Sequence, residues 1–350
     1  MNLTDTKKAG IIHKIVKSKV LNFIEEKEDN IKYTELAEFI ENNIRTFSKG
    51  KGNLNNGIAF PAGLSNNNIA AHDTCISEND TRVYCKNSDV IKIDYGVHIK
   101  GSIVDSAFTI NKTEKYSPIC EASYEAVKNV IKNVRPDVRI STLGEISQEI
   151  VDSYEYNNEP VKVIDNLAGH TIGHYSIHNG KYIYGCKNPI LLENSSMGGN
   201  NTRLEEGEYC AIEIFTTNGN GNTKLEGETT FFKIALSVQF DIYTRYQKDG
   251  TAHKDICEII KNNFHTLPFT QRYINYYTEG ISYKIINDTL DTLYTLGLLA
   301  KYPPLVDTNT SKDTIVAQYE DTLYIGDTKT TNLTEVTNIN FSEYNKFVWI

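Results

Sequence analysis

The sequence contains no long apolar run, no cluster of basic residues and no closely spaced pair of cysteines. No stretch approaches the roughly 18 consecutive apolar residues of a membrane-spanning helix, and the first residues lack the apolar segment of a signal peptide. The six cysteines are scattered without a C-x-x-C spacing, which excludes the usual zinc-finger and dithiol patterns and favours free thiols. We therefore expect a cytoplasmic protein that does not bind membranes.

Basic residues are also fewer than acidic residues. The chain has 36 Lys and Arg and 45 Asp and Glu, which gives a net charge of −9. No block of Lys and Arg tracks a phosphate backbone, so we do not expect nucleic acid as a partner. A chain of 350 residues with 39% hydrophobic residues and only 8 prolines is globular and long enough for two ordinary domains or one large α/β or α+β domain.

Two pairs of helices are predicted from apolar residues repeating every three to four positions. The first pair lies in residues 6–29 and 33–47, with Thr34 as the N-cap of its second helix. Residues 23–40 superpose on residues 130–147 at a constant offset of 107. This similarity indicates two related halves that each begin with two helices, unless it is a chance match between amphipathic helices.

A hairpin with two carboxylates is predicted in "IKIDYGVHIKGSIVDSAFTI", residues 91–110. Lys100-Gly101 suits a two-residue turn, which would place Asp94 opposite Ala107 and make Asp105 its diagonal neighbour on the same face. An isolated aspartate in such a strand is usually a turn or edge residue. Two on one apolar face would repel each other unless a cation compensates them.

Further metal-ligand candidates lie downstream. Glu213 and Glu320 each occur in an apolar run with high strand propensity, which makes four carboxylates in four predicted strands. His170, His174 and His178 are spaced by four, which places three rings on one face of a strand, although the spacing alone assigns no ligand.

Carboxylates with one imidazole suit a pair of Mn²⁺, Fe²⁺, Co²⁺ or Zn²⁺ ions, and the residues do not say which. Two such ions activate water and polarise a carbonyl or phosphoryl oxygen, so hydrolysis is the reaction class expected. A phosphoesterase is an alternative, but the segment 218–221, Asn-Gly-Asn-Gly, lacks the strand-to-helix context of a phosphate-binding loop.

An ordered set of motifs between about residues 55 and 325 resembles the type 2 methionine aminopeptidases. The motifs are "NNGIAFPAG", "AAHDT", "IDYGVHIKGSIVDSAFT", "GHTIGHYSIH", "EEGEYCAIEIF", "LPF", "YPPL" and "VAQYE". The resemblance implies an α+β pita-bread fold, in which two pseudo-symmetric halves with curved antiparallel sheets enclose a dimetal site. It implies a single catalytic domain over 1–350, with a helical insertion at 255–299 that is typical of type 2 enzymes. The segment 327–350 matches nothing in the family.

The same resemblance implies which residues act. The metal ligands would be Asp94, Asp105, His170, Glu213 and Glu320, and Glu213 would also transfer protons. His174 stands where relatives often have Gln and is not expected to be a ligand.

The resemblance also implies a substrate site. His72 and His178 would hold the scissile amide, and His72 would be alkylated by fumagillin-type epoxides. Phe60, Ile177 and Tyr302 would line the pocket for the methionine side chain. The implied function is removal of the initiator methionine from nascent polypeptides, by a monomer with two divalent ions and with the ribosome as a further candidate partner.

Three departures from the family pattern bear on this interpretation. The residues Thr229, Thr230 and Phe231 stand where Cys-Ser-His is expected, the charged N-terminal extension is absent, and the usual ending is missing. Two other classes stay open: a non-enzymatic binding protein of the proliferation-associated type, and a prolidase or Pro-specific aminopeptidase. The filled ligand positions and the negative charge argue against the first, and the helical insertion argues against the second.

Overall fold

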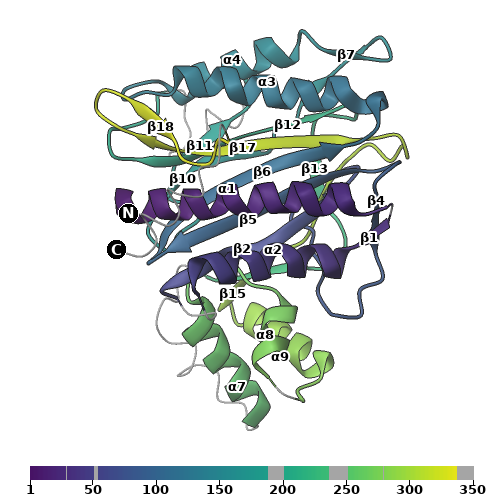
Figure 1. The fold of residues 1–350 in the computed structure, drawn as a ribbon, viewed down its shortest axis with the longest axis vertical. Coiled ribbons are helices and arrows are strands. Elements are labelled where there is room, and N and C mark those ends of the chain that lie inside the picture. The colour runs from purple at the N-terminus through teal and green to yellow at the C-terminus, as the bar shows by residue number, and fades with distance from the viewer. Residues whose placement is uncertain (29, 51–53, 188–200, 236–250, 279, 337–350) are drawn as a thin grey trace.

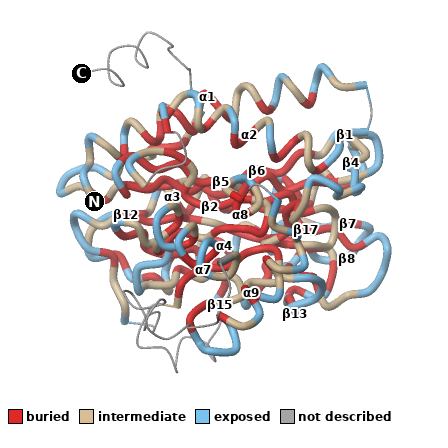
Figure 2. Tube along the Cα trace, turned by 90° about the horizontal axis from the view of Figure 1, so that it is seen from below, coloured by how far each residue is buried: buried red, intermediate tan, exposed pale blue. Residues whose placement is uncertain are grey.

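The structure is a computed structural model that describes residues 1–28, 30–50, 54–187, 201–235, 251–278 and 280–336. Helices cover two neighbouring antiparallel sheets, and a group of short helices lies at one end of the molecule (Figure 1). Buried stretches run along the central strands, whereas exposed stretches lie mostly on the helices and loops around them (Figure 2).

The first half of the chain packs two helices on a three-stranded sheet. The elements are α1 (Leu3–Glu26), α2 (Tyr33–Ser48), β2 (Asn56–Asn66), β5 (Val90–Ile99) and β6 (Ser102–Asn111), with strand order β2-β5-β6. A short pair, β1 (Asn30–Lys32) and β4 (Val83–Cys85), lies beside them. Helix α1 packs on β5 and β6, and α2 packs on β2. The N-cap prediction for Thr34 is wrong, because α2 begins at Tyr33 directly after the extended Lys32 and has no side-chain cap.

The second half repeats this arrangement with a larger sheet. Its helical elements are η1 (Glu114–Tyr116), α3 (Ser117–Asn133) and α4 (Ile140–Val151). Its sheet has the order β11 (Tyr182–Tyr184), β10 (Ala168–Ile172), β12 (Tyr209–Thr217), β17 (Val316–Ile325) and β18 (Thr330–Asn332), with β9 (Lys162–Val163) also on β12. Strands β7 (Glu155–Tyr156) and β8 (Glu159–Pro160) form a separate hairpin, and α3 packs on β12 and β17.

The predicted internal repeat is present in the helix boundaries. Helix α1 ends at Glu26 and α3 at Asn133, while α2 begins at Tyr33 and α4 at Ile140. Both pairs of residues are 107 positions apart, which is the offset that the sequence predicts. Each half therefore packs a pair of helices on one sheet, and the two halves meet where β6 lies beside β17 (Figure 1).

Side-chain hydroxyls join the two halves where β6 passes β17. Ser106 Oγ donates to the Glu320 carbonyl oxygen at 2.6 Å, and Thr322 Oγ1 donates to the Asp105 carbonyl oxygen at 2.5 Å. These strands are not paired by a backbone ladder. The hydroxyl bonds therefore set the distance between the strand that carries Asp105 and the strand that carries Glu320.

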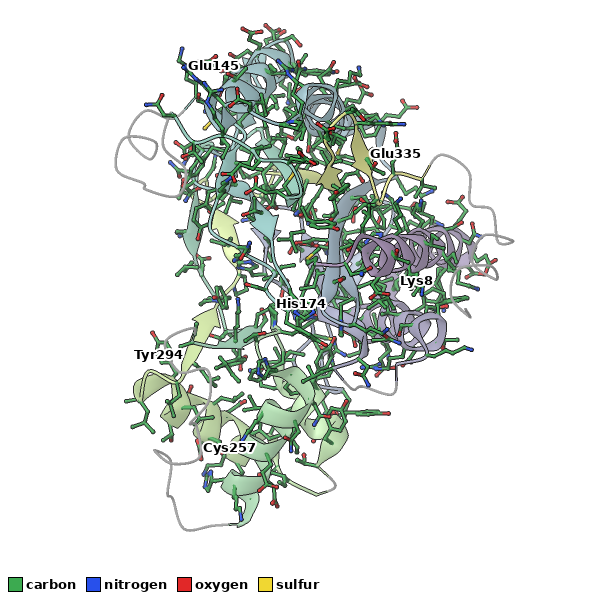
Figure 3. The ribbon with its side chains drawn as sticks, turned by 90° about the vertical axis from the view of Figure 1, so that its left-hand side faces the viewer. Lys8, Glu145, His174, Cys257, Tyr294 and Glu335 are labelled. Carbon is green, nitrogen blue, oxygen red and sulfur yellow. The ribbon has the colours of Figure 1, made fainter. Side chains whose placement is uncertain are left out.

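The predicted helical insertion forms a compact group with its own core. It contains α7 (Thr251–Ile259), a π-helical turn (Ile260–Phe264), α8 (Gln271–Tyr277) and α9 (Tyr283–Thr295). It packs on the pair β14 (Phe231–Ile234) and β15 (Leu299–Tyr302), and Figure 3 labels two of its residues, Cys257 and Tyr294. The strands β13 (Thr223–Leu225), β16 (Leu305–Asp307) and β3 (Ile69–Ala71) form a further small sheet.

The start of the segment 327–350 belongs to the fold. Strand β18 extends the larger sheet, and Leu333 is buried against α1 at Gly10. The rest of this predicted segment, from residue 337 onwards, lies outside the described residues. In the described part of the chain, no helix combines the length and the apolar character needed to cross a bilayer.

Candidate metal centre and substrate cavity

The hairpin β5–β6 forms with the register that the sequence predicts. Lys100 and Gly101 form the turn with φ angles of 48° and 75°, the left-handed values that a type I′ turn needs. Asp94 pairs with Ala107 and Gly96 with Asp105. The two carboxylates are therefore diagonal neighbours on one face of the sheet, as predicted.

The other three ligand candidates are placed by the larger sheet. Glu213 on β12 lies directly opposite Glu320 on β17, and His170 on β10 lies opposite Ala211. Gly169 allows this close approach, because a Cβ at Gly169 would collide with the Ala211 carbonyl oxygen. The four segments that carry the candidate carboxylates are all β-strands, and each contributes one acidic side chain to the site.

The five side chains meet at the junction between the two sheets. His170 Nε2 lies 3.6 Å from Asp105 Oδ2 and 3.8 Å from Glu213 Oε1. One ligand atom each from Asp105, His170 and Glu320 lie within 4.8 Å of one another, and these three residues are buried. Asp94 lines the same cavity. This cluster has the spacing of a metal site.

Burial and mutual repulsion act against ionisation of the four carboxyls. Burial raises the pKa of Asp94 to about 7, although a hydrogen bond from Gln318 acts in the opposite direction. Burial, followed by the charges of Asp94 and Glu213, raises the pKa of Asp105 well above its usual range. Burial, followed by the charge of Asp94, raises the pKa of Glu213, and burial, followed by the charges of Asp105 and Glu213, raises the pKa of Glu320. Without cations the cluster would hold protons at neutral pH.

The donor set fits divalent metal ions. Asp94 Oδ1 and Asp105 Oδ1 are buried and have no hydrogen-bond partner, so these oxygens are available as ligands. Burial lowers the pKa of His170 to about 4, which keeps the imidazole neutral at pH 7 as metal coordination requires. Oxygen ligands with one imidazole match the predicted Mn²⁺, Fe²⁺, Co²⁺ or Zn²⁺ and do not select among them.

A cavity of about 260 Å³ opens beside this cluster, at the junction of the sheets with β14, β15 and the loop before α8. It is lined by every site residue that the sequence predicts: Phe60, His72, Asp94, Asp105, His170, Ile177, His178, Glu213, Tyr302 and Glu320. The metal candidates and the predicted pocket residues thus share one space.

His72 occupies a strained position at the wall of this cavity. It follows β3 with a φ of 61°, in the left-handed region that non-glycine residues rarely adopt. Its carbonyl oxygen accepts a hydrogen bond from Thr230 Oγ1, and its buried Nδ1 has no partner. Its ring centre lies 5.7 Å from that of Tyr302. Burial lowers its pKa to about 4, so the ring is neutral at pH 7 and can donate one hydrogen bond.

The expectation that three histidine rings share one face of a strand is wrong. Strand β10 ends at Ile172, and the chain then turns. The His178 ring returns to lie 4.3 Å from the His170 ring, centre to centre. His174 is exposed, and its Nε2 lies 2.7 Å from the Lys100 carbonyl oxygen, outside the cavity lining (Figure 3).

Two polar residues of this region were not singled out from the sequence. Gln318 Nε2 donates to Glu213 Oε2 at 3.2 Å, and Lys233 lines the cavity. Gln318 lies two residues before Glu320, so strand alternation alone places both side chains on one face and would have identified it. Lys233 lies two residues after Phe231 in the same way.

Two helix-covered sheets that present four carboxylates and a histidine to one cavity define a pita-bread protein with a metal-binding centre. The chain matches the model of metallopeptidase family M24 over residues 4–279. It is 38% identical over 325 residues to a Methionine aminopeptidase 2 of Clavispora lusitaniae, covering 92% of this chain and 68% of that one. A Methionine aminopeptidase 2 of Debaryomyces hansenii is 36% identical, with 92% and 71% covered. The chain belongs to metallopeptidase family M24.

Solved structures share its fold at low sequence identity. A thermophilic Arx1 superposes with a TM-score of 0.70 at 14% identity, over 99% of this chain and 98% of that one. The methionine aminopeptidase of Rickettsia prowazekii superposes with a TM-score of 0.58 at 16% identity, over 94% of this chain and 95% of that one. The prolidase of Pyrococcus furiosus superposes with a TM-score of 0.51 at 16% identity, over 95% of this chain and 64% of that one. The predicted pita-bread fold is confirmed.

Proposed function

We propose that this protein is a type 2 methionine aminopeptidase that removes the initiator methionine from polypeptides by metal-assisted hydrolysis of the first peptide bond. The observation that carries the proposal is the single cavity in which the five candidate ligands face His72, His178 and an apolar wall. The curated relatives named Methionine aminopeptidase 2 support the same activity.

Asp94, Asp105, His170, Glu213 and Glu320 would hold two divalent ions. When bound, such ions supply an activated water and polarise the scissile carbonyl. The four carboxylates neutralise two divalent ions, and their burial excludes the bulk water that would weaken this attraction.

Glu213 is suited to moving a proton towards the leaving amine. Its Oε2 is held by the Gln318 amide, which leaves Oε1 towards His170 and the cavity. His72 and His178 stand at the cavity wall and would donate hydrogen bonds to the scissile amide and to the oxygen that gains charge in the transition state. The strained backbone of His72 supports such a role, since strain of this kind is frequent at functional sites.

The apolar part of the cavity would bind the methionine side chain. Phe60 is buried with its ring over Gly96, where a Cβ would collide with that ring. Ile177 and Tyr302 complete the predicted pocket, and Phe231 pairs with Tyr302 across β14–β15. Phe231 makes the pocket more apolar than the histidine expected there would, which favours an unbranched thioether.

The proposal extends to partners and location. The substrates would be the N-termini of nascent polypeptides in the cytoplasm, and the ribosome is a candidate docking partner. The protein would act as a monomer without binding nucleic acid or membranes, as its negative net charge favours.

Release of free methionine from Met-Ala-Ser tests the proposal. The purified protein would be stripped with a chelator, reloaded with Mn²⁺ or Co²⁺, and compared with its Phe231→His variant. Metal-restored release is the expected result. Cleavage of Ala-Pro or of a phosphodiester without methionine release would instead favour a prolidase or a phosphoesterase, and no turnover by either protein would favour a binding protein.

Covalent labelling tests the role of His72 separately. A fumagillin-type epoxide should add to the wild-type protein and not to a His72→Ala variant, as measured by the mass of the intact protein. Labelling of both proteins would remove His72 from its proposed place beside the substrate.

A further inference from the structure

Lys233 is a buried cation on the cavity side of β14. Phe231 and Lys233 are two residues apart and both line the cavity, whereas the alternate residues Phe232 and Ile234 pack in the core of the helices α7–α9. Lys233 pairs with Ala300 on β15, two positions along the ladder from the Phe231–Tyr302 pair. The alternation of the strand therefore directs this lysine to the same face as the proposed methionine pocket.

The ammonium group of Lys233 lacks a counter-charge within the protein as described. The residue is only 5% exposed. Among the described residues, the Lys233 side chain has no hydrogen bond or ion pair, whereas three other lysines pair with carboxylates: Lys181, Lys224 and Lys301. A buried charge without a partner is costly, so such groups usually serve a ligand or a reaction.

The position of the charge places it beside the substrate and not in the core. Lys233 lines the same cavity as His170 and His178. These are the proposed metal ligand and one of the proposed amide-binding residues. The Lys233 side chain therefore shares the cavity in which the peptide bond would be held.

The metal centre itself does not require this lysine. Two divalent ions balance the four carboxylates in the proposed centre, so no negative charge is left for Lys233 to neutralise. Its buried ammonium is then available to an anion that enters with the substrate. A carboxylate is the anion that peptides carry, and charge-assisted bonds of this kind are strong in a buried site.

We propose that Lys233 determines specificity by binding a carboxylate of the peptide substrate, so that the cavity prefers peptides with an acidic group near the scissile bond. This inference rests on the proposed aminopeptidase function. The carboxylate has three possible sources: the first side chain, the second side chain, or the C-terminus of a short peptide. A buried charged donor discriminates against substrates that leave it unpaired, whichever source applies.

Three peptide pairs separate these sources on the Mn²⁺-loaded protein. Glu-Ala-Ser-amide is compared with Gln-Ala-Ser-amide, Met-Asp-Ser-amide with Met-Asn-Ser-amide, and Met-Ala-Ser with its C-terminal amide. Binding is measured by titration calorimetry and hydrolysis by release of the first residue. The proteins are the wild type, Lys233→Met, which removes the charge at similar length, and Lys233→Arg, which keeps it. Lys301→Met on β15 is the matched control, since Lys301 lies outside the cavity lining and pairs with Asp291.

We expect the acidic member of at least one pair to bind the wild type about tenfold more tightly than its neutral counterpart, which corresponds to about 1.4 kcal/mol. The preference should disappear in Lys233→Met and persist in Lys233→Arg and Lys301→Met. Equal affinities within every pair, no binding of any acidic peptide, or a preference that survives in Lys233→Met would overturn the inference. A uniform loss for all six peptides in Lys233→Met would also overturn it, because that result indicates a general structural effect. Preferential binding without hydrolysis would leave the inference standing and count against the aminopeptidase activity.

Discussion

Gln318 Nε2 donates a hydrogen bond to Glu213 Oε2 at 3.2 Å, across the pair of strands that carries both glutamates of the metal centre. The bond holds one oxygen of Glu213 and leaves the other towards His170 Nε2, 3.8 Å away. Gln318 itself is buried, and its own Oε1 has no partner among the described residues. The glutamine therefore orients a carboxylate that has two proposed roles.

Replacing Gln318 by Leu should slow methionine release without emptying the centre. Loss of a group that orients a metal ligand typically costs about 10- to 100-fold in activity or affinity, and we expect the loss here in kcat. Metal content by plasma mass spectrometry and the rate with Met-Ala-Ser would be measured together. An unchanged kcat would show that Glu213 needs no such support.

Substitution of the ligands should affect metal retention as well as rate. Asp105→Asn and Glu320→Gln each remove a charge from the buried cluster, so we expect turnover to fall by more than about 100-fold and the bound metal to be lost on dialysis. His72→Ala is the control that separates the two effects. It should keep both ions and lose rate, because His72 lines the cavity without belonging to the ligand cluster.

The stabilisation gained from metal should grow with pH. In the metal-free protein the Asp94 carboxyl has a folded-state pKa of about 7, above the ~3.9 of an unfolded chain. Between these values the folded state holds a proton that the unfolded state has released, so the metal-free protein loses stability as pH rises through this window. The metal-bound protein requires the ionised carboxylate and does not incur this loss.

The corresponding measurement compares thermal unfolding of metal-free and Mn²⁺-loaded protein at pH 5.5 and pH 7.5. Groups outside the centre titrate in both forms and cancel in the difference. We expect the increase in Tm on metal loading to be several degrees larger at pH 7.5. An equal or smaller increase at the higher pH would contradict the raised pKa values of the cluster.

A buried ion pair joins the helical insertion to helix α2. Arg272 on α8 donates from Nη2 to Glu41 Oε1 on α2 at 2.6 Å, and Tyr273 donates to the same oxygen at 2.7 Å. Arg272→Met would leave Glu41 charged, buried and without its main partner, which typically costs about 3–5 kcal/mol. Arg45→Met is the control, because Arg45 lies 3.9 Å from Glu41 and is one-quarter exposed. Denaturant unfolding should show a large loss for the first variant and less than about 1 kcal/mol for the second.

The hydroxyl bonds between β6 and β17 should matter for stability. Thr322 Oγ1 accepts from the Asp105 amide at 2.7 Å and donates to the Asp105 carbonyl oxygen at 2.5 Å. Thr322→Val keeps the shape and leaves two buried backbone groups unpaired, so we expect a loss of about 1–3 kcal/mol each for the groups left unsatisfied. Thr331→Val on the neighbouring strand β18 changes the same atoms at a half-buried position and should be nearly neutral. Equal stability of the two variants would contradict a role for these bonds in joining the halves.

Local patterns in the sequence determined much of this protein. The two-residue turn at Lys100-Gly101 set the register of the hairpin, and the alternation of the strand then placed Asp94 and Asp105 on one face. The 107-residue repeat predicted that the first pair of helices recurs in the second half, because helix periodicity depends on residues only three or four positions apart. Strand propensity singled out Glu213 and Glu320, and the ordered motifs that resemble the type 2 methionine aminopeptidases then implied the full set of ligand candidates, which line one cavity.

Tertiary structure alone decided which side chains from distant segments meet. The histidine spacing of four predicted one shared face, but β10 ends at Ile172 and the turn that follows directs His174 outwards while His178 returns to His170. The sequence also does not reveal that Lys233 has no charge partner among the described residues, since this depends on the strand that pairs with β14 and on the helices packed behind it. A periodic pattern assigns a face to each residue, whereas its partner follows from contacts between strands that are far apart in the sequence, as for Asp105 and Thr322.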